Sequence, residues 1–160
     1  MHWKNKMKKT PIVAGNWKMN KLPSEGSSFI SEISKLVKDI KAVEVIYAPP
    51  FTGLFDLKVK SPFHIAAQNC HWEDCGALTG EISLTMIKDC GAEYVIIGHS
   101  ERRHIFNETD EWINNKVRAV LSNDLKPILC IGETIEQRES GATKSILENQ
   151  LGKGLSSIEK

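Results

Sequence analysis

The chain has 160 residues, of which 26% are charged and 41% hydrophobic, and its formal net charge is +1 at neutral pH. This length and composition fit a single soluble domain that can bury a substantial core. The near-neutral charge argues against nucleic acid or a membrane surface as the main partner, and no apolar run approaches the roughly 18 residues of a membrane span.

The first nine residues are basic, and no apolar segment follows them. This pattern excludes a secretory signal, so we expect a basic flexible tail at 1–9 and one domain at 10–160. Four cysteines occur, without CxxC pairs or histidines at zinc-site spacing. We therefore expect reduced thiols in a cytoplasmic protein, and we predict that Cys130, inside an apolar run, is a small core residue.

Five short apolar runs, most of them rich in β-branched residues, predict strands, with helical patterns between them. In chain order the runs are Ile12–Ala14, Val45–Ala48, Ile65–Ala67, Tyr94–Ile97 and Ile128–Ile131. Apolar residues at helical spacing from Phe29 to Ile40 predict the first helix. Thr109 is a candidate N-cap for a second helix, and a third is predicted to begin near Thr143.

Strands that alternate with helices predict an α/β fold with a parallel sheet and right-handed crossovers. Such a sheet is either open and doubly wound or closed as a (βα)8 barrel. No GxGxxG motif follows the first strand, which disfavours the dinucleotide-binding form of the open sheet. The glycines of Gly152–Gly154 lie in a predicted helix, so they do not form a phosphate loop.

Polar side chains follow four of the five predicted strands. These residues are Asn16, Lys18, Gln68, Asn69, His99, Glu101 and Glu133. Any one of them alone could be an incidental loop residue. Because parallel strands point the same way, however, their carboxyl ends share one rim, and barrel enzymes build their active sites there. The joint arrangement therefore predicts a site on this rim.

The segment Ala14–Asn20, with the sequence AGNWKMN, resembles the first-strand motif of the triosephosphate isomerase family. Further motifs of that family resemble, in family order and at family spacing, Ala66–Asn69, Gly76–Ser83, Ile97–Arg103 and Cys130–Glu133. The resemblance covers nearly the whole chain after Lys9. It implies a TIM (βα)8 barrel, present here as an incomplete barrel of about five βα units.

The resemblance implies an isomerase that interconverts dihydroxyacetone phosphate and D-glyceraldehyde 3-phosphate through an enediolate, in glycolysis and gluconeogenesis, without a cofactor or metal. Lys18 resembles the catalytic lysine near the substrate's phosphate and developing oxyanion, with Asn16 and Trp17 as substrate-binding neighbours. His99 resembles the electrophile that polarises the carbonyl, and the family's histidine is an established example of a neutral imidazole at a helix N-terminus. Glu101 resembles the catalytic carboxylate that pairs with the lysine.

Supporting roles are implied for Ser100, Cys130 and Glu133, of which Ser100 begins the predicted helix after the histidine. The segment 69–80 resembles the family's long third loop, which enters the partner subunit, so the resemblance implies a homodimer. Within this loop, Thr79 resembles the residue that reaches the partner's active site. Loops of this length without secondary structure are uncommon and usually functional.

A complete barrel of this class needs roughly 250 residues. We therefore expect the family's glutamate base, its mobile lid and its last phosphate-binding loops to lie outside this sequence. We expect the 160 residues alone to be inactive, and to be poorly soluble, partly molten or rescued by association. Three interpretations stay open. The chain is part of a triosephosphate isomerase, or a non-catalytic truncated half-barrel that needs a complementary fragment, or a piece of another phosphosugar enzyme on the same barrel.

Overall fold

Five parallel strands form one sheet, and their order in the sheet is their order in the sequence. The computed structural model describes residues 10–40, 42–60 and 63–158. The strands are β1 (Ile12–Asn16), β2 (Glu44–Ala48), β3 (His64–Ala67), β4 (Tyr94–Ile97) and β5 (Lys126–Leu129). A sequential order distinguishes a βα barrel from a doubly wound sheet, in which the strand order reverses.

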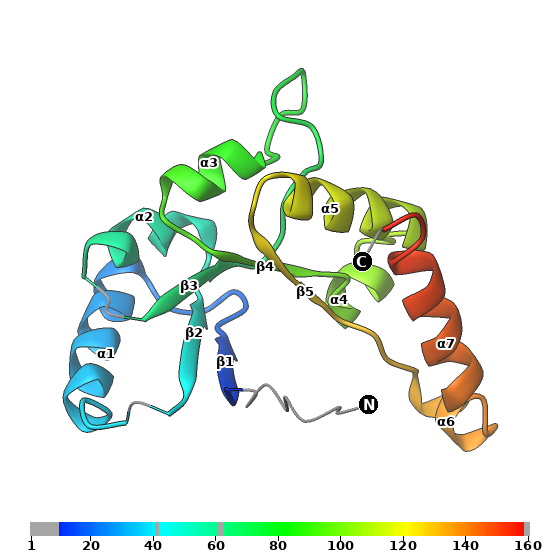
Figure 1. Ribbon diagram of the computed structural model, residues 1–160, viewed down its shortest axis with the longest axis horizontal. Coiled ribbons are helices and arrows are strands. Elements are labelled where there is room, and N and C mark those ends of the chain that lie inside the picture. The colour runs from blue at the N-terminus through cyan, green and yellow to red at the C-terminus, as the bar shows by residue number, and fades with distance from the viewer. Residues whose placement is uncertain (1–9, 41, 61–62, 159–160) are drawn as a thin grey trace, which may run out of the picture.

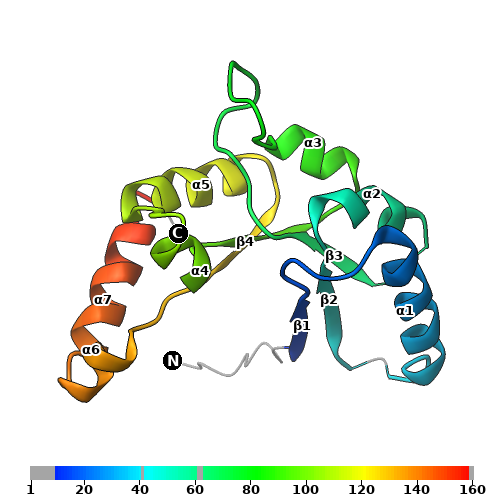
Figure 2. The same ribbon diagram turned by 180° about the vertical axis from the view of Figure 1, so that it is seen from behind.

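The sheet is curled, and the longer helices cover its convex outer face (Figures 1 and 2). These are α1 (Pro23–Leu36), α2 (Phe51–Lys60), α3 (Leu84–Asp89), α5 (Asp110–Ser122) and α7 (Thr143–Gly154). The short helices α4 (Ser100–His104) and α6 (Ile135–Glu139) follow β4 and β5. The predicted partial TIM barrel of five βα units is thereby confirmed.

All five predicted strands are present, but the fifth is displaced. It begins at Lys126 and ends at Leu129, so Ile131 lies beyond it. Pro127 sits inside this strand opposite Val95, and proline is tolerated there because β5 is an edge strand among the described strands. The prediction that the fifth strand runs to Ile131 is therefore wrong.

The first helix also differs from its prediction. Pro23 occupies its first turn, where the missing N–H costs nothing, and the helix ends at Leu36, before Ile40. The second helix begins as predicted, because the side chain of Thr109 accepts a hydrogen bond from the backbone N–H of Trp112. The third begins at Thr143, as predicted.

Alternate residues of β2, β3, β4 and β5 face different cores, which is why these strands contain continuous apolar runs. On the outer face, Val95 and Ile97 pack under the helices in the larger core. On the inner face, Tyr94 and Ile96 join a smaller cluster with Ala66. The sheet is thus buried on both faces around β3 and β4. This packing fixes the positions at which the loops after these two strands begin.

Residues 68–83, between β3 and α3, form a long loop that projects from the body of the molecule (Figure 1). At its root, the backbone N–H of His71 donates to the carbonyl of Ile82 at 2.9 Å. The tip is exposed, and Leu78 is 39% accessible. The predicted loop without helix or strand is present, and its role in a partner subunit stays a prediction.

Among the described strands, β1 pairs only with β2 and β5 only with β4, so both ends of the sheet have an unpaired edge. At the β1 edge Ile12 and Val13 are 54% and 60% exposed. No helix among the described residues is long and apolar enough to cross a membrane.

Candidate active site

Lys18 follows β1 in a turn that an ordinary side chain rarely adopts. The backbone N–H of Trp17 donates to the carbonyl of Ala48 at 3.0 Å, which prolongs the pairing with β2 by one residue. Lys18 then has a φ of 53°, in the left-handed region, where non-glycine residues are strained. The side chain of Asn16 accepts the N–H of Lys18 at 2.9 Å. Asn16, predicted as a neighbour of Lys18, is thus hydrogen-bonded to its backbone.

Gln68, the residue that follows β3, holds this turn. Its side-chain amide donates to the carbonyls of Lys18 at 2.9 Å and Ala48 at 2.8 Å. Asn20 adds a hydrogen bond from its amide to the carbonyl of Trp17 at 2.9 Å. Strain of this kind persists only where the surroundings over-determine the backbone. The position of the Lys18 backbone is therefore fixed from β1, β3 and its own turn.

One carboxylate joins the lysine to the histidine. The ammonium Nζ of Lys18 lies 2.8 Å from Oε1 of Glu101, and Nδ1 of His99 lies 3.5 Å from the other oxygen, Oε2. The hydrogen bond from Lys18 holds the pKa of the Glu101 carboxyl below its usual range. The structure thus brings together the three residues for which catalytic roles were predicted.

The hydrogen bonds of His99 determine where its proton lies. His99 is the N-cap of α4, and its Nδ1 accepts the backbone N–H of Glu101 at 3.3 Å. In the neutral tautomer that fits this acceptor role, Nδ1 is unprotonated and the hydrogen lies on Nε2, from which it can be donated to a substrate oxygen.

Arg103 joins the loop after β4 to the loop after β5. Its guanidinium donates to the carbonyls of Gly98 at 2.8 Å and Cys130 at 3.1 Å, and it pairs with Asp110 at 2.7 Å. Gly98 has a φ of 70°, and a Cβ there would lie 2.9 Å from the guanidinium Nη2. Sequence reasoning assigned no role to Arg103, although the paired arginines after the strand were a visible signal.

Beside His99 lies a cavity of about 260 Å³, bounded by the loops after β4 and β5. Cys130 lines it, and burial raises the pKa of its thiol. Glu133 also lines it, and its carboxylate lies 3.3 Å from the Thr143 hydroxyl and 3.4 Å from Nε of Arg138. Ser100 begins α4, and the supporting roles predicted for these three residues stay predictions.

Two predicted site residues lie further from this centre. The ring of Trp17 packs beside Phe29 and Tyr47, with centroids 5.8 Å and 6.1 Å away. Thr79 is exposed on the projecting loop, and its predicted contact with a partner subunit is untested. No group of three or more metal-ligating side chains occurs within the described parts of the chain.

A buried cluster of charged side chains lies behind the helix that follows β4. It was not predicted from the sequence. The ammonium of Lys116 contacts Glu108, and it donates to Asn69 at 2.9 Å, while Nε of Arg102 lies 3.1 Å from the same Glu108 oxygen. The cluster joins α5, α4 and the root of the projecting loop. Lys116 lies on the apolar face of its helix, one residue before Val117, and this misplaced charge was the available signal.

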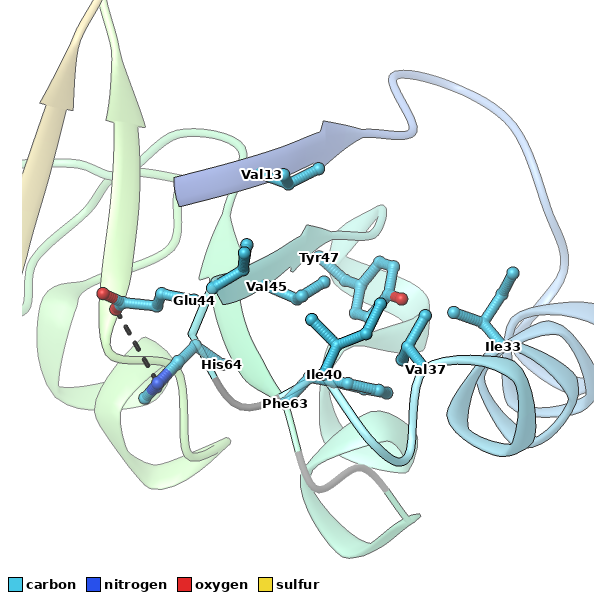
Figure 3. A pocket seen from close by; sticks show the side chains of 10 residues that line it. Val13, Ile33, Val37, Ile40, Glu44, Val45, Tyr47, Phe63 and His64 are labelled. Atoms are coloured by element: carbon cyan, nitrogen blue, oxygen red, sulfur yellow. Dashed lines mark ion pairs between the residues drawn. The ribbon is translucent and has the colours of Figure 1, made fainter. Parts of the chain in front are cut away.

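A larger apolar cavity of about 460 Å³ lies elsewhere, between α1 and the outer face of β1 and β2 (Figure 3). Its polar part is Glu44 and His64, whose side chains approach within 3.7 Å. Both residues begin their strands, whereas ligands of parallel sheets bind beyond the carboxyl ends. Size alone therefore does not make this cavity the candidate active site.

We expect the contact between Lys18 and Glu101 to persist in acid below the usual glutamate range. Because the folded-state pKa of Glu101 is lowered, its contribution to stability is complete above the unfolded-state value and is lost as the pH falls through the lowered value. A ¹³C NMR titration of the Glu101 carboxyl will show this. In Lys18→Met the same carboxyl should titrate at higher pH, and equal titration curves would contradict the contact.

Comparison with known proteins covers nearly all of the residues described above. A sequence model of the family described as triosephosphate isomerase matches residues 11–160. The triosephosphate isomerase of Carboxydothermus hydrogenoformans is 48% identical over 92% of this chain and 60% of its own length. That of Caldanaerobacter subterraneus is 49% identical over 94% and 61%. That of Chloroherpeton thalassium is 51% identical over 92% and 60%. The chain thus spans about 60% of the length of these curated relatives.

Proposed function

The chain belongs to the triosephosphate isomerase family, and from this premise we propose that it provides the lysine and histidine of a site that interconverts dihydroxyacetone phosphate and D-glyceraldehyde 3-phosphate. The observation that carries the proposal is the shared carboxylate of Glu101, which lies against the ammonium of Lys18 and the imidazole of His99. Two groups that flank one carboxylate can contact the same three-carbon substrate.

The proposed chemistry is stabilisation of a negative charge on oxygen. When a proton leaves the carbon next to the carbonyl, the charge that develops on the carbonyl oxygen meets donors already in place. Nε2–H of His99 donates to this oxygen, and the ammonium of Lys18 attracts both the oxygen and the dianionic phosphate. Glu101 acts through Lys18, because its carboxylate holds the ammonium at the rim.

The base that takes the carbon proton must be a different group. Among the described carboxylates near His99, Glu101 is bound by Lys18 and Glu133 is held by Thr143 and Arg138. General-base catalysis requires a carboxylate within reach of the substrate carbon. We propose that this base is the glutamate that the resemblance implies for a sixth strand.

A chimera tests the proposal directly. Residues 11–160 are joined to the unmatched remainder of the Caldanaerobacter subterraneus relative, and dihydroxyacetone phosphate formation is followed by coupled oxidation of NADH. We expect the chimera to isomerise triose phosphate at rates typical of enzymes. A chimera that folds cooperatively, as judged by circular dichroism and calorimetry, but does not isomerise would contradict the proposal.

A second candidate is a non-catalytic half-barrel that binds a complementary polypeptide, and the unpaired edges of β1 and β5 favour it. The 160-residue chain, assayed alone and with the separately expressed remainder of the relative, distinguishes the candidates. Activity that appears only on mixing supports both a site and a docking edge. Binding without activity would favour the second candidate over the first.

The remaining proposals concern the setting of the reaction. We propose that the protein acts in the cytoplasm, in glycolysis and gluconeogenesis, as a homodimer formed through the loop 69–80. What supports the dimer is the projection of this loop (Figure 1) and the exposed side chain of Leu78 within it.

A further inference from the structure

The indole ring of Trp17 packs against the backbone of α1 at a residue that has no side chain. Gly26 lies in α1, and a Cβ built on it would be 2.7 Å from Cζ3 and 3.2 Å from Cη2 of the Trp17 indole. Real side chains do not approach so closely, so only glycine admits the ring in this position. Glycine is among the least favourable residues inside a helix, which makes its presence here notable.

Aromatic neighbours hold the ring on its other sides. The indole meets Phe29 of α1 edge to face, with centroids 5.8 Å apart, and it lies 6.1 Å from the ring of Tyr47 on β2. Phe29 and Tyr47 also meet edge to face at 6.2 Å. The indole is therefore a fixed wedge between the first helix and the second strand.

The wedge is one peptide bond from the strained residue that presents the ammonium. The carbonyl of Trp17 accepts a hydrogen bond from Asn20, and the next residue, Lys18, takes the left-handed conformation. The Phe29 and Tyr47 rings hinder rotation of the indole, so a displacement of the indole passes to the Trp17 backbone and from there to Lys18. The contact of Lys18 with Glu101 is 2.8 Å long, so a small movement breaks it.

We propose that Gly26 is a positioning residue for the Lys18 ammonium: its absent side chain forms the slot for the Trp17 indole, and the indole fixes the turn that brings Lys18 to Glu101. Gly26 acts only through Trp17 and touches no substrate. The inference rests on the proposed function of Lys18, but its structural part can be measured without catalysis.

The titration of Glu101 reports the position of Lys18, because the hydrogen bond from Lys18 is the main cause of its lowered pKa. We expect Gly26→Ala to raise the Glu101 pKa toward that of Lys18→Met, in ¹³C NMR titrations of the chimera. His99, the other titratable group against Glu101, is the same in every variant. An unchanged Glu101 pKa in Gly26→Ala would overturn the proposal.

Gly152 of α7 provides a matched control. It is also a helical glycine, but apart from its chain neighbours and the backbone of its own helix, no atom of the described residues lies within 4 Å of a Cβ placed there. We expect Gly152→Ala to leave the Glu101 titration as in the wild type. A shift as large as that of Gly26→Ala would show that any glycine substitution has this effect, and it would overturn the proposal.

A rescue variant separates positioning from general damage. Trp17→Phe removes part of the ring, so it loosens the wedge, and in Gly26→Ala/Trp17→Phe the added methyl group fills the freed space. We expect the double variant to have a Glu101 pKa closer to the wild-type value than either single variant. If Gly26→Ala does not fold, the comparison of the double variant with Trp17→Phe decides. A double variant no closer to wild type contradicts the proposal.

The activity of the chimera distinguishes a failure of this inference from a failure of the proposed function. If Gly26→Ala raises the Glu101 pKa and also lowers kcat/KM, both stand. If the pKa rises while kcat and KM of the chimera are unchanged, Gly26 positions Lys18 but the role proposed for Lys18 fails. If activity falls without a change in the pKa, the positioning inference is wrong.

Discussion

Replacing His99 with glutamine will lower kcat of the chimera by about 10²–10⁴-fold, the usual contribution of a positioned acid or base. Glutamine keeps an N–H donor, but its amide does not exchange protons with substrate oxygens as an imidazole does. The fold should tolerate the change, since His99 caps only the five-residue helix α4. The measurement is the coupled assay, with the melting temperature recorded on the same samples.

His64→Gln is the matched control for this prediction. His64 begins β3 at the opposite end of the strands, where its Nδ1 lies 2.8 Å from a carboxylate oxygen of Glu93. We expect its kcat to stay within a few-fold of the wild type. If His64→Gln and His99→Gln lose activity equally, or if neither loses it, the assignment of His99 as the electrophile is wrong.

Replacing Lys116 with methionine should destabilise the chain by about 3–5 kcal/mol, the cost of removing one partner from a buried ion pair. The side chains of Glu108 and Lys116 are only 1% and 4% exposed. One oxygen of Glu108, Oε2, already has no hydrogen-bond partner among the described residues. Without Lys116 the carboxylate keeps only Arg102, so urea unfolding should show the loss as a lower midpoint.

Two further variants test whether the loss of stability in Lys116→Met comes from the unpaired buried charge. Lys144→Met removes a lysine that faces Glu148 at the surface, where the side chains are 87% and 67% exposed, and it should change stability by less than about 1 kcal/mol. The double variant Lys116→Met/Glu108→Leu removes both charges and should recover much of the lost stability. Equal effects of Lys116→Met and Lys144→Met would contradict the buried pair.

The strands could be predicted because each contains a short apolar run, and the run is clearest where the strand is buried on both faces, as Tyr94–Ile97 is. The ten-residue helix α2 was not predicted, and most of the other helices that escaped prediction have only five or six residues, so that end signals specify them more than periodicity does. In α6, Thr134 and Gln137 form a capping box, a pattern readable in the sequence but too common to identify a five-residue helix by itself. The bounds of β5 depended on Pro127, whose tolerance requires an edge position that only the sheet order reveals.

The place of the site could be predicted because parallel strands deliver their following residues to one rim. The partners within it could not. Gln68 was visible as a rim residue, but its two acceptors, the carbonyls of Lys18 and Ala48, belong to other strands or loops. The same holds for Gly26, because nothing in the sequence around it shows that the indole of Trp17 packs against it. Such contacts depend on tertiary packing, which no local pattern contains.

The most direct test records the NMR signals of the Lys18 ammonium nitrogen and of the His99 imidazole nitrogen while substrate is added. In ¹⁵N-labelled chimera, dihydroxyacetone phosphate should shift the signals of Lys18 Nζ and His99 Nε2 with one common Kd, and inorganic phosphate should shift Lys18 far more than His99. Signals that respond with different Kd values, or a His99 signal that does not respond at saturating substrate, would show that the two nitrogens do not serve one triose phosphate.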